Sequence, residues 1–147
     1  MAEPRAAAGG ASGFAAVLLW VQGAYYLLTG LWPLVSIRTF ILVSGPKTDH
    51  LQAPDPTEAD HWLVMTVGAL IAGAALALLA AAWRRSASPE IVVLALAMAA
   101  ALGTIDVVYV SRGVIWPIYL ADAAIEAALI AAWVAWLAFG QQKPAPA

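Results

Sequence analysis

The chain has 147 residues, of which 63% are hydrophobic and only 11% are charged, whereas soluble domains average about 45–50% apolar and about 25% charged residues. A soluble domain of this length cannot bury so much apolar surface, so the composition excludes a soluble fold. The net charge of −2 with scattered basic residues argues against a nucleic-acid partner, and the lack of cysteine excludes disulfides, thiolate catalysis and cysteine metal centres.

The first apolar run covers residues 14–35, after an Ala/Gly-rich segment, residues 1–12, that is predicted to be disordered. A helix of that length crosses about 30 Å of hydrocarbon at about 1.5 Å per residue. A secretory signal peptide is the alternative interpretation. Because the preceding segment carries a single basic residue, Arg5, and the run is longer than the apolar part of a signal peptide, we expect an uncleaved membrane helix.

The one long connection follows, and we expect an outer loop over residues 36–57. Its first part, residues 37–43, combines Arg38 with bulky apolar groups, so we expect it to lie on the membrane surface or to dip into it. Thr57 and Asp60, three residues apart, form a variant of the capping box. They predict that the second membrane helix covers residues 58–83.

The second predicted helix carries small residues spaced four apart, a spacing that lets helices approach closely in lipid. These pairs are Gly68 with Ala72 and Ala69 with Gly73. The Ala/Gly-rich face is therefore a candidate docking surface for a second copy of the chain or for another membrane protein.

The third and fourth membrane helices have readable boundaries. Ser88, Pro89 and Glu90 supply a cap, a proline at the first helical position and an acid, which predicts a helix over residues 89–112 that Gly113 ends. Pro117 opens the last helix, residues 117–139, and the Pro/Ala-rich tail, residues 141–147, is predicted to be disordered. The sequence thus predicts an all-α fold, an integral membrane four-helix bundle within residues 13–140.

Four spans put both termini and the 84–88 connection on one side of the cell membrane. The basic residues are Arg5, Arg84, Arg85 and Lys143 on that side and Arg38, Lys47 and Arg112 on the other. This small excess predicts that both termini are cytoplasmic. Trp32, Trp62 and Trp116 stand where apolar runs meet polar ones, the position of aromatic residues at a bilayer surface.

Three carboxylates lie inside the last two predicted helices: Asp106, Asp122 and Glu126. Since a charged group within a bilayer costs at least about 2.5–3.5 kcal/mol, each needs a physical reason to be there. At about 1.5 Å per residue, Asp106 lies about 9 Å and Asp122 about 8 Å below the outer surface, and Glu126 lies about 14 Å deep, near the midplane. Asp122 and Glu126 are four residues apart and share a helix face.

The first predicted helix carries a matching polar stripe at the spacing i, i+3, i+4 and i+7, made of Gln22, Tyr25, Tyr26 and Thr29. We therefore expect a polar cavity in the outer half of the bundle, with Arg38, Lys47 and Arg112 as cationic partners for the acids. An acid without such a partner is expected to hold a proton. The candidate ligand-binding residues are Gln22, Tyr25, Tyr26, Thr29, Arg38, Asp106, Tyr109, Arg112, Tyr119, Asp122 and Glu126.

No metal site or cofactor is predicted. Asp49-His50 and Asp60-His61 lack the spacing of helical metal ligands, and we interpret them as solvated loop and helix-cap groups. The sequence contains no phosphate-binding glycine loop, zincin motif or Gly-x-Ser-x-Gly motif. The two histidines lie at or outside the predicted membrane surface, where they are not placed to ligate a haem between helices.

The segment Tyr119-Leu-Ala-Asp122-Ala-Ala-Ile-Glu126, taken with Ile105-Asp106, is the nearest that the chain comes to a motif. In architecture, residues 14–139 resemble small bacterial four-helix membrane proteins of the DoxX-like and uncharacterised-domain kind. They resemble more distantly the sterol-isomerase/sigma-2 receptor class, whose bundles hold ligands against membrane carboxylates. Sterol isomerases use a histidine within the membrane, which the helices of this chain lack, so the resemblance implies no catalytic role here.

Three functions stay open. The favoured hypothesis is a protein that binds or transports a small cationic or amphipathic molecule, or protons, with carboxylates neutralising the charge and tyrosines offering aromatic faces. In the second, the polar cluster only locks the helices of an accessory or structural subunit. The third and weakest is an enzyme acting on a lipid-soluble substrate, with Glu126 or Asp122 as acid/base. The sequence favours a protein that is not an enzyme, with the lipid bilayer as its certain partner.

Overall fold

The computed structural model describes residues 13–45 and 61–140. Within them lie five helices: α1 (Gly13–Val35), α2 (Ile37–Ser44), α3 (His61–Trp83), α4 (Pro89–Ser111) and α5 (Tyr119–Phe139). All except α2 are long and apolar enough to cross a membrane. The predicted all-α bundle with four membrane-spanning helices is confirmed. The predictions for residues 1–12, 46–60 and 141–147, including the cap at Thr57, lie outside the described residues.

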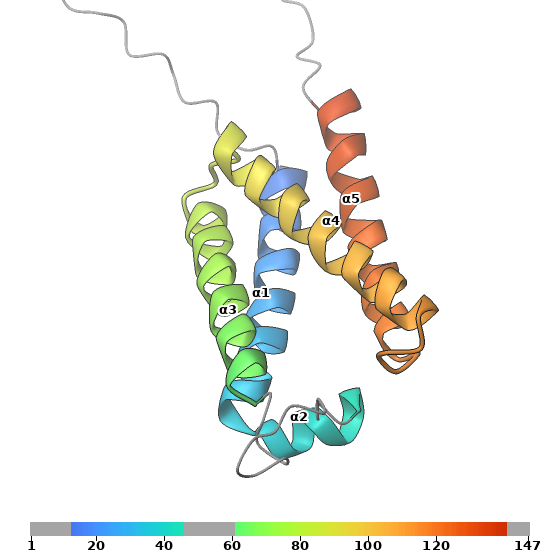
Figure 1. Cartoon of the computed structure of the whole chain (residues 1–147). Coiled ribbons are helices and arrows are strands. Elements are labelled where there is room, and N and C mark those ends of the chain that lie inside the picture. The colour runs from blue at the N-terminus through green and yellow to red at the C-terminus, as the bar shows by residue number, and fades with distance from the viewer. Residues whose placement is uncertain (1–12, 46–60, 141–147) are drawn as a thin grey trace, which may run out of the picture.

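The four long helices run up and down in turn and form two antiparallel pairs, α1 with α3 and α4 with α5 (Figure 1). The α3–α4 connection lies at the same end of the bundle as the described chain ends, Gly13 and Gly140. The other end carries α2 and the α4–α5 connection, and we call it the α2 end. α4 begins beside α3 and crosses obliquely to the start of α5 at the α2 end, so it connects the two pairs (Figure 1).

Glycines hold α1 and α3 together, backbone against backbone. A Cβ added to Gly30 would lie 2.7 Å from the backbone nitrogen of Ala72, and one added to Gly68 would lie 2.7 Å from the carbonyl oxygen of Gly30. The small pair Gly68 and Ala72 is therefore buried against α1 within the chain, and this half of the predicted docking face is already occupied. Ala69 and Gly73, the other pair, are exposed.

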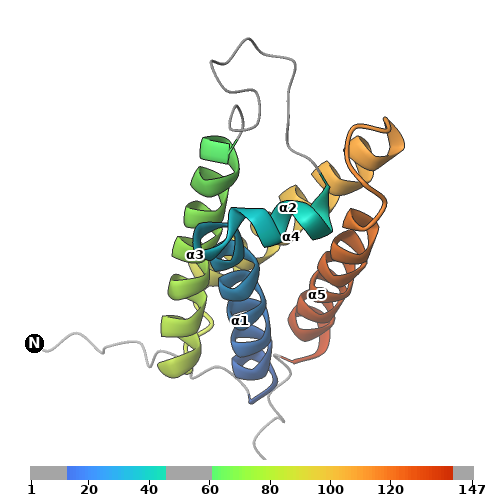
Figure 2. The same ribbon diagram turned by 90° about the horizontal axis from the view of Figure 1, so that it is seen from below.

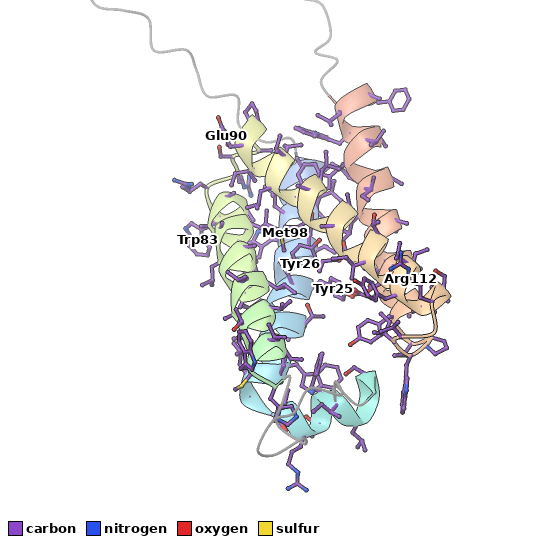
Figure 3. All side chains as sticks on the ribbon, in the orientation of Figure 1. Tyr25, Tyr26, Trp83, Glu90, Met98 and Arg112 are labelled. Carbon is purple, nitrogen blue, oxygen red and sulfur yellow. The ribbon has the colours of Figure 1, made fainter. Side chains whose placement is uncertain are left out.

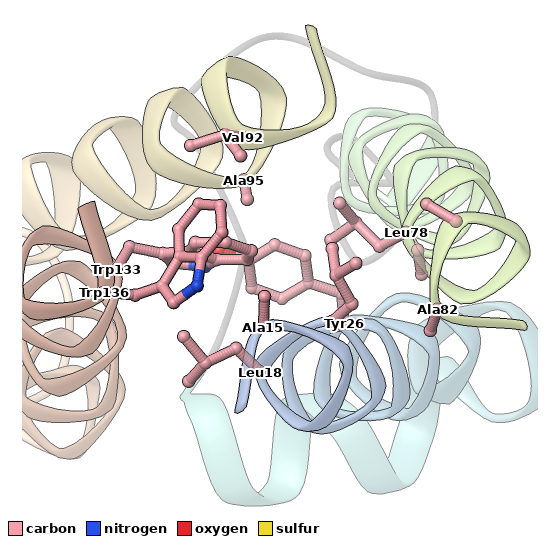
Figure 4. Packing of buried hydrophobic residues seen from close by; sticks show 12 residues of the cluster. Ala15, Leu18, Tyr26, Leu78, Ala82, Val92, Ala95, Trp133 and Trp136 are labelled. Carbon is pink, nitrogen blue, oxygen red and sulfur yellow. The ribbon is translucent and has the colours of Figure 1, made fainter. Parts of the chain in front are cut away.

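The apolar core lies in the half of the bundle opposite the α2 end. It combines alanines, which let the four helices meet closely, with leucine, valine and aromatic side chains that fill the space between them (Figure 4). They include Ala15, Leu18 and Leu19 of α1, Leu78 and Ala82 of α3, Val92 and Ala95 of α4, and Trp133 and Trp136 of α5. The two indole rings pack edge to face with centroids 5.5 Å apart, an arrangement that suits their quadrupoles. The buried polar side chains therefore lie in the middle of the bundle and toward the α2 end.

The segment expected to be an outer loop begins with a helix, which corrects that prediction for residues 37–44. Ser36 caps α2 by accepting a hydrogen bond from the backbone of Thr39, and the Trp32 indole of α1 donates to the Thr39 hydroxyl at 3.0 Å. These two local hydrogen bonds stabilise the helix, because so short an apolar segment does not form a stable helix on its own. The prediction that this segment lies along the membrane surface fits a helix that runs across the bundle rather than along it (Figure 2).

Gly45 connects the end of α2 to the second helix pair. Its φ of 90° favours glycine, and a Cβ there would lie 2.8 Å from the Trp116 ring in the α4–α5 connection. α2 therefore reaches from the end of α1 to the turn between α4 and α5. The other boundaries follow the sequence closely: Pro89 starts α4, Gly113 with φ 69° follows its end, and α5 begins at Tyr119, two residues after the predicted Pro117.

Candidate functional site

A polar cluster joins three helices in the middle of the bundle, and Gln22 of α1 is its centre. The Gln22 side-chain nitrogen donates to the Ala95 carbonyl of α4 at 2.8 Å and to the Tyr26 hydroxyl at 3.0 Å, while its oxygen accepts from the Trp133 indole of α5 at 2.8 Å. Gln22, Tyr26 and Trp133 are fully buried. Since lipid offers no hydrogen bonds, a buried amide needs such partners.

Glu126 follows Tyr26 in this series of hydrogen bonds. The Tyr26 hydroxyl donates to Oε2 of Glu126 at 2.8 Å. The Glu126 side chain is 1% exposed, and its other oxygen, Oε1, is buried without a hydrogen-bond partner in the part of the chain that the structure describes. Gly103 of α4 allows this position, because a Cβ there would lie 3.2 Å from the Cβ of Glu126.

Asp122 lies one helical turn from Glu126, nearer the α2 end, and is half-buried. The Tyr25 hydroxyl of α1 donates a short hydrogen bond to its Oδ1. The rings of Tyr25 and Tyr26 are tilted against each other with centroids 5.9 Å apart. Figure 3 shows both tyrosines between α1 and the second helix pair. Two neighbouring residues of one helix thus bind two acids of another.

Asp106 completes what we call the carboxylate cluster: Asp106, Asp122 and Glu126. Asp106 is 6% exposed, and both it and Asp122 lie near enough to Glu126 to interact electrostatically with its carboxyl group. Among the described residues, no three His, Asp or Glu side chains are grouped closely enough to hold a metal ion. The cluster is therefore a set of neighbouring like charges rather than a preformed metal cage.

The expected cationic partners lie elsewhere. Arg112 is exposed beyond the end of α4, with its guanidinium 5.8 Å from the centre of the Tyr109 ring (Figure 3). Arg38 is exposed on α2. Within residues 13–45 and 61–140, no arginine forms an ion pair with Asp122 or Glu126. Lys47 lies outside the described residues.

The remaining candidate residues are not all part of one site. Thr29 turns its hydroxyl back onto its own helix, to the carbonyls of Tyr25 at 3.0 Å and Tyr26 at 3.3 Å, as threonines in membrane helices do. Tyr109 is 41% exposed, and Tyr119 is half-buried at the first position of α5. The structure therefore brings Gln22, Tyr25, Tyr26, Asp106, Asp122 and Glu126 together and places Arg38, Tyr109 and Arg112 apart from them. Thr29 touches this group only through the backbone of its own helix.

The carboxylate cluster lines neither of two hollows on the surface of the described residues. One lies between the start of α1 and the end of α5, lined by Phe14, Ala135, Trp136, Phe139 and Gly140. The other lies on α2, lined by Ser36, Arg38, Thr39 and Leu42. Asp122 and Glu126 are instead hydrogen-bonded to Tyr25 and Tyr26, and the predicted cavity beside the acids has no counterpart in these two hollows.

Comparison with models of protein families, with curated proteins and with solved structures finds no match for this chain. The interpretation of the site therefore rests on its own residues.

Sequence reasoning missed two members of the polar cluster, Trp133 and the carbonyl of Ala95. Trp133 follows Glu126 by seven residues, so it lies on the same face of α5, and this spacing was the available signal. The carbonyl of Ala95 gave none, because every residue has a carbonyl and its use depends on how α4 crosses α1.

Proposed function

We propose that this membrane protein binds a small cation or protons at the carboxylate cluster. Glu126 carries the argument, because it is fully buried and one of its oxygens has no hydrogen-bond partner among the described residues. A buried carboxylate that is ionised and unpaired is very costly, so Glu126 needs either a proton or a positively charged ligand. The nearby acids Asp106 and Asp122 increase this need.

The arrangement also supports a direction of access. Asp122 is half-buried, one turn closer to the α2 end than Glu126, and it is held by Tyr25. On the other side of Glu126 lie the Gln22–Trp133 bond and the apolar core. A cation therefore reaches Glu126 from the α2 end. If both termini are cytoplasmic, as the distribution of basic residues predicts, this access is from outside the cell.

The experiment that tests this proposal uses dicyclohexylcarbodiimide, an apolar reagent that modifies protonated carboxyl groups in membranes. The full chain in lipid nanodiscs is treated at a series of pH values, and the modified residue is located by mass spectrometry. We expect modification of Glu126 that falls as pH rises, and we expect sodium, potassium or tetramethylammonium ions to reduce it if one of them competes with the proton.

Glu126→Gln supplies the assignment, and Thr66→Val supplies a control, since Thr66 is an exposed residue of α3 that bonds only its own helix. The first variant should lose the modification and the second should keep it. Equal modification of the parent chain and Glu126→Gln contradicts the proposal, and so does a yield that neither pH nor any of the three cations changes.

An accessory or structural subunit is the second candidate, favoured by Gln22. Its amide is satisfied by hydrogen bonds to groups of α1, α4 and α5, which is what a polar lock between helices requires. The exposed pair Ala69 and Gly73 is the part of the Ala/Gly-rich face that remains for a second copy or another membrane protein. This candidate predicts a stoichiometric partner on purification and a carboxylate cluster that responds to no cation.

A further inference from the structure

We infer that the positive charge held at Glu126 is a proton on its Oε1 atom, and that Trp133, Gln22 and Tyr26 form a chain of donors that assigns the proton to this oxygen. The inference rests on the proposed function and names its ligand. Gln22 and Tyr26 are then positioning residues, because they act on Glu126 through hydrogen bonds and do not carry the proton themselves.

The orientation of the Gln22 amide determines which group donates and which accepts in each hydrogen bond of this series. The Trp133 indole nitrogen can only donate, so the group that faces it at 2.8 Å is the amide oxygen. The Ala95 carbonyl can only accept, so the group that faces it at 2.8 Å is the amide nitrogen. Turning the amide over would set donor against donor and acceptor against acceptor, and only one orientation is allowed.

The orientation of the Gln22 amide also determines how the Tyr26 hydroxyl is used. The second N–H of the Gln22 amide points to the Tyr26 hydroxyl oxygen at 3.0 Å, so that oxygen acts as the acceptor of this bond. The hydroxyl hydrogen is then free to be donated to Oε2 of Glu126 at 2.8 Å. A proton on Oε2 would leave two buried groups unsatisfied, the Tyr26 hydrogen without an acceptor and Oε1 without a donor. A proton on Oε1 leaves only its own O–H without a partner among the described residues. Glu126 therefore keeps Oε2 as an acceptor and carries its proton on Oε1.

A metal ion fits this position poorly. Calcium takes six to eight oxygen ligands and magnesium takes six in a near-octahedral arrangement. Around Glu126, the Gln22 oxygen already accepts from Trp133, and the Tyr26 oxygen is used as both acceptor and donor. No three metal-binding side chains are grouped within the described residues. A proton needs only one lone pair, which Oε1 supplies.

The charged and titratable groups around Glu126 come from three helices. Tyr25 and Tyr26 face it from α1, Asp106 interacts with it from α4, and Asp122 lies one turn away on α5. The only titratable side chain of α3 is His61, at its first position. Among residues 13–45 and 61–140, the groups that interact with Glu126 are thus acids and a phenol, and a proton is the charge that balances them.

Infrared difference spectroscopy of the full chain in nanodiscs tests the inference, because a protonated carboxyl group has a C=O stretching band whose frequency reports hydrogen bonding. A proton on Oε1 makes Oε2 the C=O oxygen, and this oxygen accepts from Tyr26. We expect a band that Glu126→Gln removes, at the lower frequency of a hydrogen-bonded carbonyl. The parent chain and Glu126→Gln are sufficient for this measurement.

Tyr26→Phe removes the donor and keeps the ring. We expect the band to move to the higher frequency of a free carbonyl, since Oε2 loses its hydrogen bond from Tyr26. Gln22→Met, similar in shape, should move the band in the same direction by less, because it removes only the donor behind Tyr26. Tyr109→Phe, away from the cluster, should leave the band unmoved.

The outcomes separate this inference from the proposed function. A Glu126 band at the free-carbonyl frequency in the parent chain overturns the inference, and so does a band that Tyr26→Phe leaves unmoved, although Glu126 still holds a proton in both cases. If the Glu126 band and the carbodiimide modification both appear only when the cations are left out, the ligand is a cation and not a proton. If both measurements give nothing, the proposed function fails as well.

Discussion

Gln22 illustrates how a polar side chain becomes stable in the interior of a membrane protein. Both of its N–H groups donate, to Ala95 and Tyr26, and its oxygen accepts from Trp133. Each partner comes from a backbone or side chain that the fold holds in place, so the amide is satisfied without water. The same residue ties α1 to α4 and α5, and its contribution to stability depends on these bonds being made together.

Removing one partner should reveal this dependence. Trp133→Phe leaves the Gln22 oxygen buried without a donor, which should lower the free energy of unfolding by about 1–3 kcal/mol beyond the cost of the smaller side chain. The smaller side chain costs the same when Gln22 is already Met, so a double-mutant cycle isolates the bond. The measurement is reversible unfolding in mixed micelles. Costs that simply add in the double variant contradict the role of the bond.

For single residues, the sequence predicted the helix face on which a side chain lies better than it predicted the group that this side chain contacts. The spacing of Gln22, Tyr25 and Tyr26 and of Asp122 and Glu126 identified the side chains that meet. The arginines were expected to pair with the acids, but among the described residues Asp122 and Glu126 are bound by tyrosines. Spacing along a helix does not say how far beyond its end a long side chain extends. Arg112 follows the last turn of α4 and stacks on Tyr109 instead. The proposed ligand-binding role of the remaining candidate residues stays a prediction.

Among the elements, α1 and α3 form the closest pair, and glycine is the reason. Gly30 and Gly68 bring the two backbones so near that an added Cβ would lie 2.7 Å from backbone atoms of the other helix. In lipid, where apolar side chains gain little by leaving the hydrocarbon, such close contact is the main source of attraction between helices.

Gly30→Ala should therefore separate α1 from α3 and lower the free energy of unfolding by about 1–3 kcal/mol through overpacking. Gly73→Ala is a matched control, because it makes the same change in a membrane helix where nothing lies within 4 Å of the added Cβ. We expect it to be neutral or slightly stabilising, since alanine favours helix. Thermal unfolding followed by circular dichroism compares the two. An equal loss in both variants would show that glycine flexibility, and not the contact, is what matters.

The sequence did not predict α2 as a helix. Eight residues are too few for a clear periodic pattern, and the isolated segment has no strong propensity of its own. Its helix depends on tertiary contacts: the Trp32 indole bound to Thr39, the Trp32 ring against Phe40 with centroids 5.7 Å apart, and Gly45 against Trp116. The long helices were predicted from the length of their apolar runs, and residues such as Pro89 and Gly113 mark where a run begins or ends.

The whole molecule consists of two helix pairs, each made of consecutive membrane spans (Figure 1). The pairs meet through α1 with α5 and α3 with α4, and Gln22, Tyr25 and Tyr26 make the polar contacts between them. The sequence predicted the number of spans but not this pairing, because side chains facing lipid and side chains facing the core are both apolar and show no period. The resemblance to small four-helix membrane families also stays a prediction at this scale.

Because each pair is continuous in sequence, two separate polypeptides should reassemble when the chain is divided between Arg85 and Ser88. We expect the fragments, produced together in one membrane, to co-purify in equal amounts through a tag on either one. Tyr26→Phe combined with Gln22→Met should lower the recovered complex severalfold, since it removes the hydrogen bonds of Gln22 and Tyr26 between the pairs and leaves only that of Tyr25 with Asp122. Fragments that never co-purify, or that do so equally well in the variant, contradict this description of the assembly.

The consecutive pairing also bears on biogenesis. During translation α1 and α3 emerge from the ribosome before the segment that carries Asp106, Asp122 and Glu126 emerges. When these acids reach the translocon, the helix bearing Tyr25 and Tyr26 is already in the bilayer with its hydroxyls available. The most expensive side chains to insert are therefore synthesised last, next to the groups that will receive them.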